Sequence, residues 1–260
     1  MKIALISFSN EGTRVAARLV GHFPQCEVFL HAGVEELPAA KRFRHVLELT
    51  AEIFSQFDGL VYVAPAGLVV RAVAPCLKHK TTDPAVVVVD VGARWAVSLL
   101  GGHEGGANDL TLAVANCLGA EPVISTTTEA IKDLIVGVGC RRGTAAGAIV
   151  RAVREALARA GADQARVRLL ASADIKADEP GLLQAARELE LPLRLIASEE
   201  IANSTRALEH SEFVREKVGL PAVAEPAALL AGRRTQLILP KTVLNGVTVA
   251  IAREGFSPSA

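Results

Sequence analysis

The sequence has few of the features that mark membrane, secreted or metal-binding proteins. Its longest apolar runs are shorter than the roughly 20 residues that a membrane-spanning helix needs. Met1 and Lys2 lead straight into a short apolar segment that is typical of a strand rather than of a signal peptide. The four cysteines are widely spaced and form no C-x-x-C pair, which argues against a structural zinc site and a disulfide framework. We therefore expect a protein of the reducing cytoplasm that has no membrane partner.

Surplus charge and aromatic side chains are also missing. Lys plus Arg is 28 and Asp plus Glu is 28, so the formal net charge is zero, and only 4% of the residues are aromatic. General nucleic-acid binding needs surplus cations, and single-strand binding needs stacking platforms, so neither is expected. What the chain does have is 260 residues of which 50% are hydrophobic, enough for one or two globular domains with a sizeable core.

Short β-branched runs alternate along the chain with amphipathic segments of helical spacing. Strands are predicted at residues 3–8, 59–64, 86–89, 95–100, 122–124, 134–138, 167–171, 193–196, 236–239 and 247–252. Asn245-Gly246 indicates a turn between the last two strands, in a loop that Pro240 lengthens. The alternation predicts an α/β fold of two domains, residues 1–131 and 132–260, each a mainly parallel sheet flanked by helices. Residues 255–260 are expected to be a frayed tail.

The most unusual segment, residues 101–109, surrounds one imidazole and one carboxylate with four glycines. It lies between a predicted strand and a predicted helix, where α/β proteins place their sites, and glycines let an anion approach backbone N–H groups. An imidazole ordinarily titrates near neutral pH, so His103 is a candidate general base, with Glu104 as a second base or an orienting group. The alternative is a tight turn in which Asn108 or Asp109 caps the helix.

A cationic cluster precedes the four-valine strand. Arg71, Lys78 and Lys80 could grip a polyanionic ligand. The alternative is a solvated loop, and this is the favoured interpretation when only the charge of the cluster is considered. Asp90 follows the same strand, either as a site residue or as a turn residue before Gly92.

The second half repeats the order of strand, glycine-rich turn and helix at residues 134–160. The turn suits a carboxylate or phosphate at a helix N-terminus. It matches neither the P-loop nor the dinucleotide fingerprint, which weakens the hypothesis of a nucleotide-dependent enzyme. Cys140 beside Arg141 and Arg142 is either an activated nucleophile or a bystander thiol, and the second interpretation is favoured.

Two acidic positions of the second half also have alternative interpretations. Lys176 and Glu179 could line a cleft, but acids just before a helix are also what the helix dipole favours. Glu225 precedes Pro226 at a predicted helix start, where capping is the simpler role.

Taken together, these motifs resemble the cobalt-precorrin-5A hydrolase family of anaerobic cobalamin biosynthesis. The family motif G-G-H-x-G-G-A-N is matched at residues 101–108. Further matches are residues 70–90, 123–129, 137–144, 176–182 and 223–228, with Glu129 where the family usually has Asp. The family's usual middle segment is missing between Glu129 and Ile131, so the chain is a compact version.

The resemblance implies a hydrolase that acts on a cobalt macrocycle with several carboxylate arms and a lactone. Water opens the lactone, and two carbons leave as acetaldehyde. The cobalt belongs to the substrate, so no cofactor and no protein metal site are expected. A non-catalytic corrinoid carrier is the alternative, and a homodimer is left open. His103 and Glu104 are expected to be catalytic. The residues expected to bind substrate are Arg71, Lys78, Lys80, Asp83, Asp90, Gly101, Gly102, Gly105, Gly106, Asn108, Thr126, Thr127, Gly139, Cys140, Arg141, Arg142, Lys176, Glu179 and Glu225.

Overall fold

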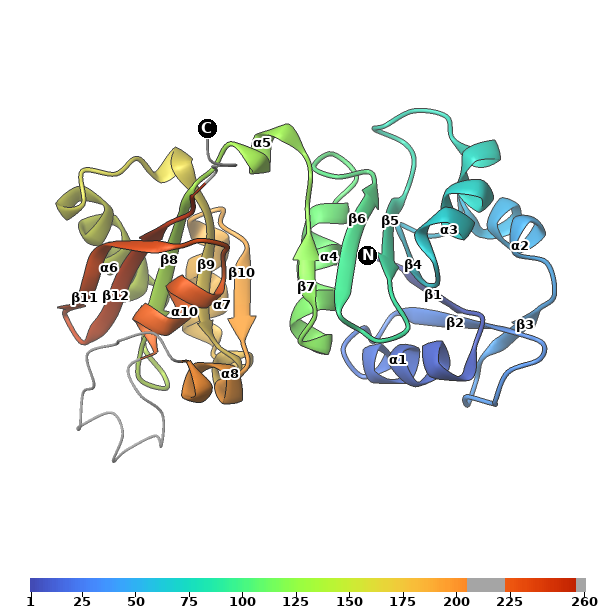
Figure 1. Cartoon of the computed structure of the whole chain (residues 1–260), viewed down its shortest axis with the longest axis horizontal. Helices are drawn as coiled ribbons and strands as arrows, with labels where there is room; N and C mark the ends of the chain where they lie inside the picture. Colours follow the sequence, from blue (N-terminus) through green and yellow to red (C-terminus); the bar gives the residue numbers. More distant parts are fainter. Residues whose placement is uncertain (205–222, 256–260) are drawn as a thin grey trace. The chain divides into compact units, whose positions relative to one another are not determined.

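The chain forms two compact units, Met1–Thr126 and Thr127–Ala260 (Figure 1). This is a computed structural model, and it describes residues 1–204 and 223–255. The sequence pattern placed the boundary between residues 131 and 132. Of the expected frayed tail, residues 256–260 lie outside the described part of the chain.

The first unit is built on a seven-stranded sheet in the order β3-β2-β1-β4-β5-β6-β7. Its strands are β1 (Ile3–Ser7), β2 (Cys26–His31), β3 (Lys41–Phe43), β4 (Gly59–Val63), β5 (Ala85–Val89), β6 (Trp95–Leu100) and β7 (Glu121–Val123). All pairings are parallel except that of β5 with β6. Strands β1, β4 and β5 are buried along their whole length, which explains their continuous apolar runs.

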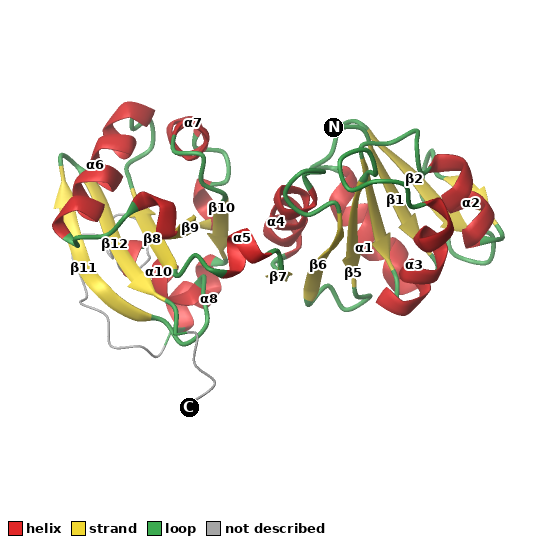
Figure 2. Ribbon diagram, turned by 90° about the horizontal axis from the view of Figure 1, so that it is seen from above, coloured by secondary structure: helices red, strands yellow, loops and turns green. Residues whose placement is uncertain are grey.

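Helices cover both faces of this sheet (Figure 2). They are α1 (Asn10–Val20), α2 (Val46–Ile53), α3 (Ala66–Val73) and α4 (Ala107–Leu118), with a 3₁₀ turn at Ala74–Cys76. Helices α1 and α4 pack side chains such as Leu19 and Val114 on one face, and α2 and α3 pack Ile53 and Val69 on the other. The result is a three-layer α/β/α unit whose loops gather at the two edges of the sheet, where the strands end.

The second unit holds a five-stranded sheet in the order β10-β9-β8-β12-β11. Its strands are β8 (Leu134–Gly139), β9 (Val167–Ala173), β10 (Leu193–Ile196), β11 (Gln236–Leu244) and β12 (Val247–Arg253). Strands β8, β9 and β10 are parallel, and β12 is antiparallel to both of its neighbours.

Helices again pack on both faces of the second sheet. The helical segments are α5 (Thr127–Ala130), α6 (Ala146–Arg159), α7 (Pro180–Glu188), α8 (Ser198–Asn203) and α10 (Ala224–Leu230), with 3₁₀ turns at Gln164–Arg166 and Asp174–Lys176. Helices α6 and α7 share a core with one face, through residues such as Ile149 and Leu182. Helices α8 and α10 pack on the other, through Ile201 and Ala228. Both units are mixed sheets flanked by helices, so the predicted α/β class is confirmed.

The hairpin at the end of the chain differs from the prediction. The expectation that Pro240 lies in a longer loop was wrong, because β11 continues through it to Leu244. Strand β11 is at the edge of the sheet, where proline is tolerated, and the pairing shifts register between Leu239 and Thr242. Asn245 and Gly246 alone form the turn, both with positive φ, as a two-residue hairpin loop requires.

Candidate functional site

The glycine turn, residues 101–106, links β6 to α4 by folding tightly on itself. Gly101 has φ of 75°, and its carbonyl accepts the N–H groups of Gly105 at 2.9 Å and Ala107 at 3.1 Å. A methyl group on Gly105 would lie only 2.8 Å from that carbonyl oxygen. The tight path therefore requires glycine, and it leaves His103 and Glu104 exposed at the tip.

The glycine turn lies next to the cationic loop, residues 78–83. A methyl group on Gly101 would be 3.1 Å from the carbonyl oxygen of Pro84, just before β5. The loop is held in place by buried Asp83, whose two carboxylate oxygens each accept the Lys78 N–H at 3.1 Å. Although the two residues are far apart in the sequence, Lys80 Nζ lies 2.9 Å from Glu104 Oε1. The structure thus brings a predicted substrate-binding lysine into contact with a predicted catalytic carboxylate.

Topology places Arg71 near the same edge of the first sheet. It is exposed in the last turn of α3, and the chain then passes through the 3₁₀ turn into the cationic loop. Because α3 returns from the carboxyl end of β4 to the start of β5, its C-terminus lies at the edge where β6 ends. Arg71, Lys78 and Lys80 therefore supply three cations to the edge that carries the glycine turn.

Asn108 and Thr126 complete this edge from the other side of the glycine turn. The buried Asn108 side chain accepts from Ser98 Oγ at 2.9 Å and donates to Thr126 Oγ1 at 3.0 Å. Gly102 has no room for a side chain, since a methyl group there would overlap Cγ2 of Thr126. Thr127, by contrast, is exposed and begins α5 in the second unit.

Asp90 lies at the opposite end of the β5–β6 hairpin. The register pairs Val89 with Ala96 and Val86 with Leu100, so Asp90 is at the hairpin tip while the glycine turn follows the other end of β6. The Asp90 carboxylate accepts the N–H groups of Arg94 and Trp95, each at 2.8 Å, and of Gly92 at 3.1 Å.

These contacts determine the ionisation of Asp90. Burial raises the pKa of this carboxyl, but the backbone N–H groups of Trp95, Arg94 and Gly92, helped by the Arg94 side chain, outweigh burial and hold the pKa below its usual range. The geometry favours the turn role for Asp90 over substrate binding.

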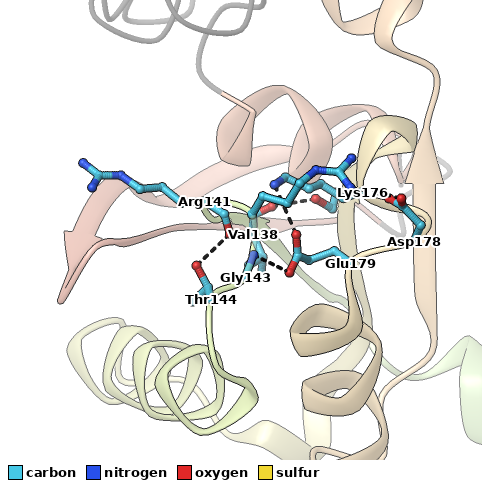
Figure 3. A network of polar contacts seen from close by, with 9 residues as sticks. Val138, Arg141, Gly143, Thr144, Lys176, Asp178 and Glu179 are labelled. Atoms are coloured by element: carbon cyan, nitrogen blue, oxygen red, sulfur yellow. Dashed lines mark hydrogen bonds and ion pairs between the residues drawn. The ribbon is translucent and has the colours of Figure 1, made fainter.

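In the second unit, a buried carboxylate organises the arginine loop, residues 139–144 (Figure 3). Glu179, at the start of α7, is 1% exposed, and its Oε1 accepts the N–H of Gly143 at 2.9 Å. Its Oε2 lies 3.6 Å from Nζ of Lys176, whose side chain is 14% exposed. Gly181 allows this approach, because a methyl group there would overlap the carbonyl oxygen of Thr144. Lys176 and Glu179 therefore form a mostly buried ion pair that braces the loop.

The charged side chains of the arginine loop face solvent. Arg141, labelled in Figure 3, is exposed. Arg142 pairs with Asp178 at 3.0 Å. Cys140 is half-buried beside Lys176, and burial raises the pKa of its thiol more than the lysine charge lowers it. A raised pKa reduces the thiolate population, which favours the bystander interpretation of Cys140.

Gly139 and Glu225 lie at the same end of β8. Gly139 ends β8 opposite Thr248 of β12, and Val223 and Ala224 are its neighbours. Glu225 is 2% exposed in the first turn of α10, and its Oε1 accepts the N–H of Lys241 at 2.6 Å. Glu225 therefore ties α10 to β11, and this contact explains its burial without a ligand.

One contributor to the site was missed by the sequence reasoning. Ser98 holds the Asn108 amide, and its only signal is a hydroxyl in an otherwise apolar strand. Two general properties also bear on function. Within residues 1–204 and 223–255, no group of three or more His, Cys, Asp or Glu side chains could hold a metal ion. None of the helices in that part of the chain is long and apolar enough to cross a membrane.

These observations define a two-unit α/β protein with a glycine-rich loop and a set of cations at one edge of each sheet. Family models agree with this division. The model described as "Cobalamin synthesis G N-terminal" matches residues 48–129, and the one described as "Cobalamin synthesis G C-terminus" matches residues 134–252. The chain belongs to the cobalt-precorrin-5A hydrolase family, whose members span nearly its whole length.

Three relatives illustrate the match. The cobalt-precorrin-5A hydrolase of Priestia megaterium is 26% identical, with 96% of this chain and 94% of the relative covered. That of Salmonella typhimurium is 24% identical, with 96% and 97% covered. A crystal structure of a putative cobalamin biosynthesis protein G homolog from Sulfolobus solfataricus is 20% identical, with 97% of both chains covered and a TM-score of 0.39. The Priestia alignment extends over 352 positions, so that relative has segments with no counterpart in these 260 residues.

Proposed function

We propose that the chain hydrolyses the lactone of cobalt-precorrin-5A and releases acetaldehyde, giving cobalt-precorrin-5B. The family membership supports the reaction. One observation supports the glycine turn as the reacting site: exposed His103 and Glu104 lie on this turn, and Glu104 contacts Lys80 of the cationic loop. One water is consumed. Its oxygen bonds to the lactone carbonyl carbon, and the bond from that carbon to the ring oxygen breaks, which leaves a hydroxyl group on the carbon to be lost. That hydroxyl then gives up its proton and becomes the carbonyl of acetaldehyde, while the bond from its carbon to the macrocycle breaks and leaves its electron pair on the macrocycle.

His103 is the candidate general base for this step. Its imidazole is exposed at the tip of the turn, so water and a bound lactone can reach it. It takes a proton from the attacking water and returns one to the departing oxygen, so that the proton count balances. Glu104 pairs with Lys80, which leaves its carboxylate to orient the bound groups rather than to act as the main base.

The cations at the glycine-turn edge of the first unit serve the carboxylate arms of the macrocycle. They are Lys78, Lys80 and Arg71, all exposed. Ammonium and guanidinium groups form charge-assisted hydrogen bonds with carboxylates, so the substrate is held by its arms. The cobalt ion enters as part of the substrate.

Anaerobic incubation of the protein with the cobalt lactone, followed by acetaldehyde analysis, tests the proposal. We expect one acetaldehyde for each lactone consumed. The alternative function, a corrinoid carrier, predicts tight binding of the same compound, measured by its absorbance change, with no acetaldehyde. A homodimer and a cytoplasmic location remain predictions, which size-exclusion chromatography with light scattering and cell fractionation test separately.

A further inference from the structure

Asn108 of α4 connects this helix with the glycine turn, with β6 and with the segment after β7. Its N–H donates to the carbonyl of Gly102 at 3.0 Å, and its side chain contacts Ser98 of β6 and Thr126 beyond β7. Asn108 is only 7% exposed. A polar side chain this deeply buried and satisfied on both ends is held in one orientation.

The directions of these hydrogen bonds determine what Thr126 can do. Ser98 Oγ donates to Asn108 Oδ1, so the amide nitrogen Nδ2 faces Thr126 and donates to its Oγ1. A threonine hydroxyl has one hydrogen to donate. Since Oγ1 already accepts from Asn108, that hydrogen is directed to another acceptor. Thr126 is half-buried rather than enclosed, so an acceptor on a ligand can reach it.

The position of Thr126 relates this hydroxyl to the reacting atoms. Its methyl group lies against Gly102, the residue before His103. Three N–H groups at this turn, those of Gly105, Ala107 and Asn108, are already donated to carbonyls of the turn itself. They cannot also stabilise negative charge on a substrate. The Thr126 hydroxyl is a side-chain donor beside the same turn, because the methyl group of Thr126 lies against Gly102.

We propose that Thr126 donates its hydroxyl hydrogen to the lactone carbonyl oxygen as negative charge develops there, with Asn108 as the positioning residue that fixes this direction. The proposal rests on the proposed hydrolase function and assigns an oxyanion donor within it. When water adds to the carbonyl carbon, the carbonyl electron pair moves to oxygen. The hydroxyl stabilises that pair until the carbonyl re-forms and the ring oxygen leaves. A donor aimed at developing charge lowers the barrier more than it tightens substrate binding.

The first test compares Thr126→Val, Thr126→Ser and the control Thr128→Val in the acetaldehyde assay with the full chain. Valine has nearly the same shape but no donor, and we expect kcat to fall about 10²-fold with KM changed less than about threefold. Serine keeps the hydroxyl, and kcat should return to within about fivefold of wild type. Thr128 is exposed, so its valine variant should match wild type. A Thr126→Val variant with wild-type kcat, or with only a raised KM, would overturn the proposal.

The second test reverses the hydrogen-bond direction with Asn108→Asp. A carboxylate at this position accepts the Thr126 hydrogen and so removes the donor, and kcat should fall as far as in Thr126→Val. The kcat of the double variant, Thr126→Val with Asn108→Asp, should be no lower than that of either single variant, because both changes remove the same hydrogen bond. Additive losses would show that the new charge acts by repelling the substrate and would contradict the assigned role. Melting temperatures identify variants that merely unfold.

The outcomes separate this inference from the function on which it rests. Acetaldehyde from wild type, with full activity in Thr126→Val, rejects the donor role and leaves the hydrolase intact. No acetaldehyde from wild type, with the corrinoid bound, rejects both.

Discussion

Lys80 and Glu104 are in contact, with the ammonium nitrogen 2.9 Å from a carboxylate oxygen, although 24 residues separate them in the chain. The contact joins the cationic loop to the glycine turn and so connects the element proposed to bind substrate with the one proposed to be catalytic. Both side chains are well exposed, so the pair contributes little to folding stability. Under the proposed function, Lys80 exchanges Glu104 for a carboxylate arm of the substrate.

The exposed position of Lys80 leads to a prediction about salt. Replacing it with Met should raise KM about fivefold at low ionic strength, since one charge-assisted contact is lost. The difference from wild type should shrink near 1 M salt, where the Debye length is about 3 Å. Lys41→Met is the matched control, because Lys41 is an exposed lysine paired with Glu27 far from the turn in sequence. An effect of Lys80→Met that persists unchanged at high salt would contradict electrostatic capture.

Asp90 should matter for stability rather than for catalysis. Asp90→Asn should lower the free energy of unfolding by about 1 kcal/mol at pH 7, because it weakens the charged hydrogen bonds of the turn. The variant should keep kcat and KM near their wild-type values. The folded pKa of Asp90 is depressed, so its stabilisation is present above the ordinary carboxyl value and is lost as the pH falls through the folded pKa. Urea unfolding at a series of pH values should therefore show the variant and wild type converging below about pH 4. A constant difference down to pH 2 would refute this account.

The contact between α7 and the arginine loop can be tested with two glycines. Gly181→Ala places a methyl group against the carbonyl of Thr144, and we expect the free energy of unfolding to fall by about 3 kcal/mol. Gly147→Ala in α6 meets only the mobile end of Arg151 at 3.4 Å, so it should be neutral or stabilise by up to about 1 kcal/mol. Urea midpoints measure both changes. Equal effects would show that the approach at Gly181 is not tight.

Cys140 should be dispensable for chemistry. The burial that raises its pKa leaves little thiolate at neutral pH. Iodoacetamide should therefore modify it more slowly at pH 7.5 than after denaturation, and Cys140→Ser should keep kcat within about threefold of wild type. Loss of activity in the serine variant, together with a thioester trapped on Cys140 by mass spectrometry, would instead establish a covalent route.

Much of the fold could be predicted because its signals are local. The four valines of β5 and the hairpin to β6 follow from burial pattern and a Gly-containing turn, and β6 and β10 begin and end at the predicted residues. Strands β2 and β3 were missed. β3 has only three residues, two of them charged. Pro240 was misjudged because the rule that excludes proline applies to central strands, and the sequence does not reveal that β11 lies at the edge.

The site was predictable in composition but not in arrangement. Glycine-rich segments and cations could be found by reading along the chain. The contact of Lys80 with Glu104 depends on β6 running antiparallel to β5, and the Gly143–Glu179 contact spans 36 residues. Such pairings depend on tertiary packing. The sequence does not show tertiary packing, so Asp90 and the glycine turn were both predicted to bind substrate. In the structure they lie at opposite ends of the β5–β6 hairpin, one strand length apart.

Acetaldehyde release by wild type and by His103→Ala is the most direct test of the central claim that the glycine turn performs the hydrolysis. Both proteins are given the cobalt lactone anaerobically, and corrinoid binding is followed in the same samples. We predict that the variant binds the substrate as tightly as wild type but forms acetaldehyde about 10²- to 10⁴-fold more slowly, as loss of a general base requires. Equal rates from the two proteins would contradict the claim.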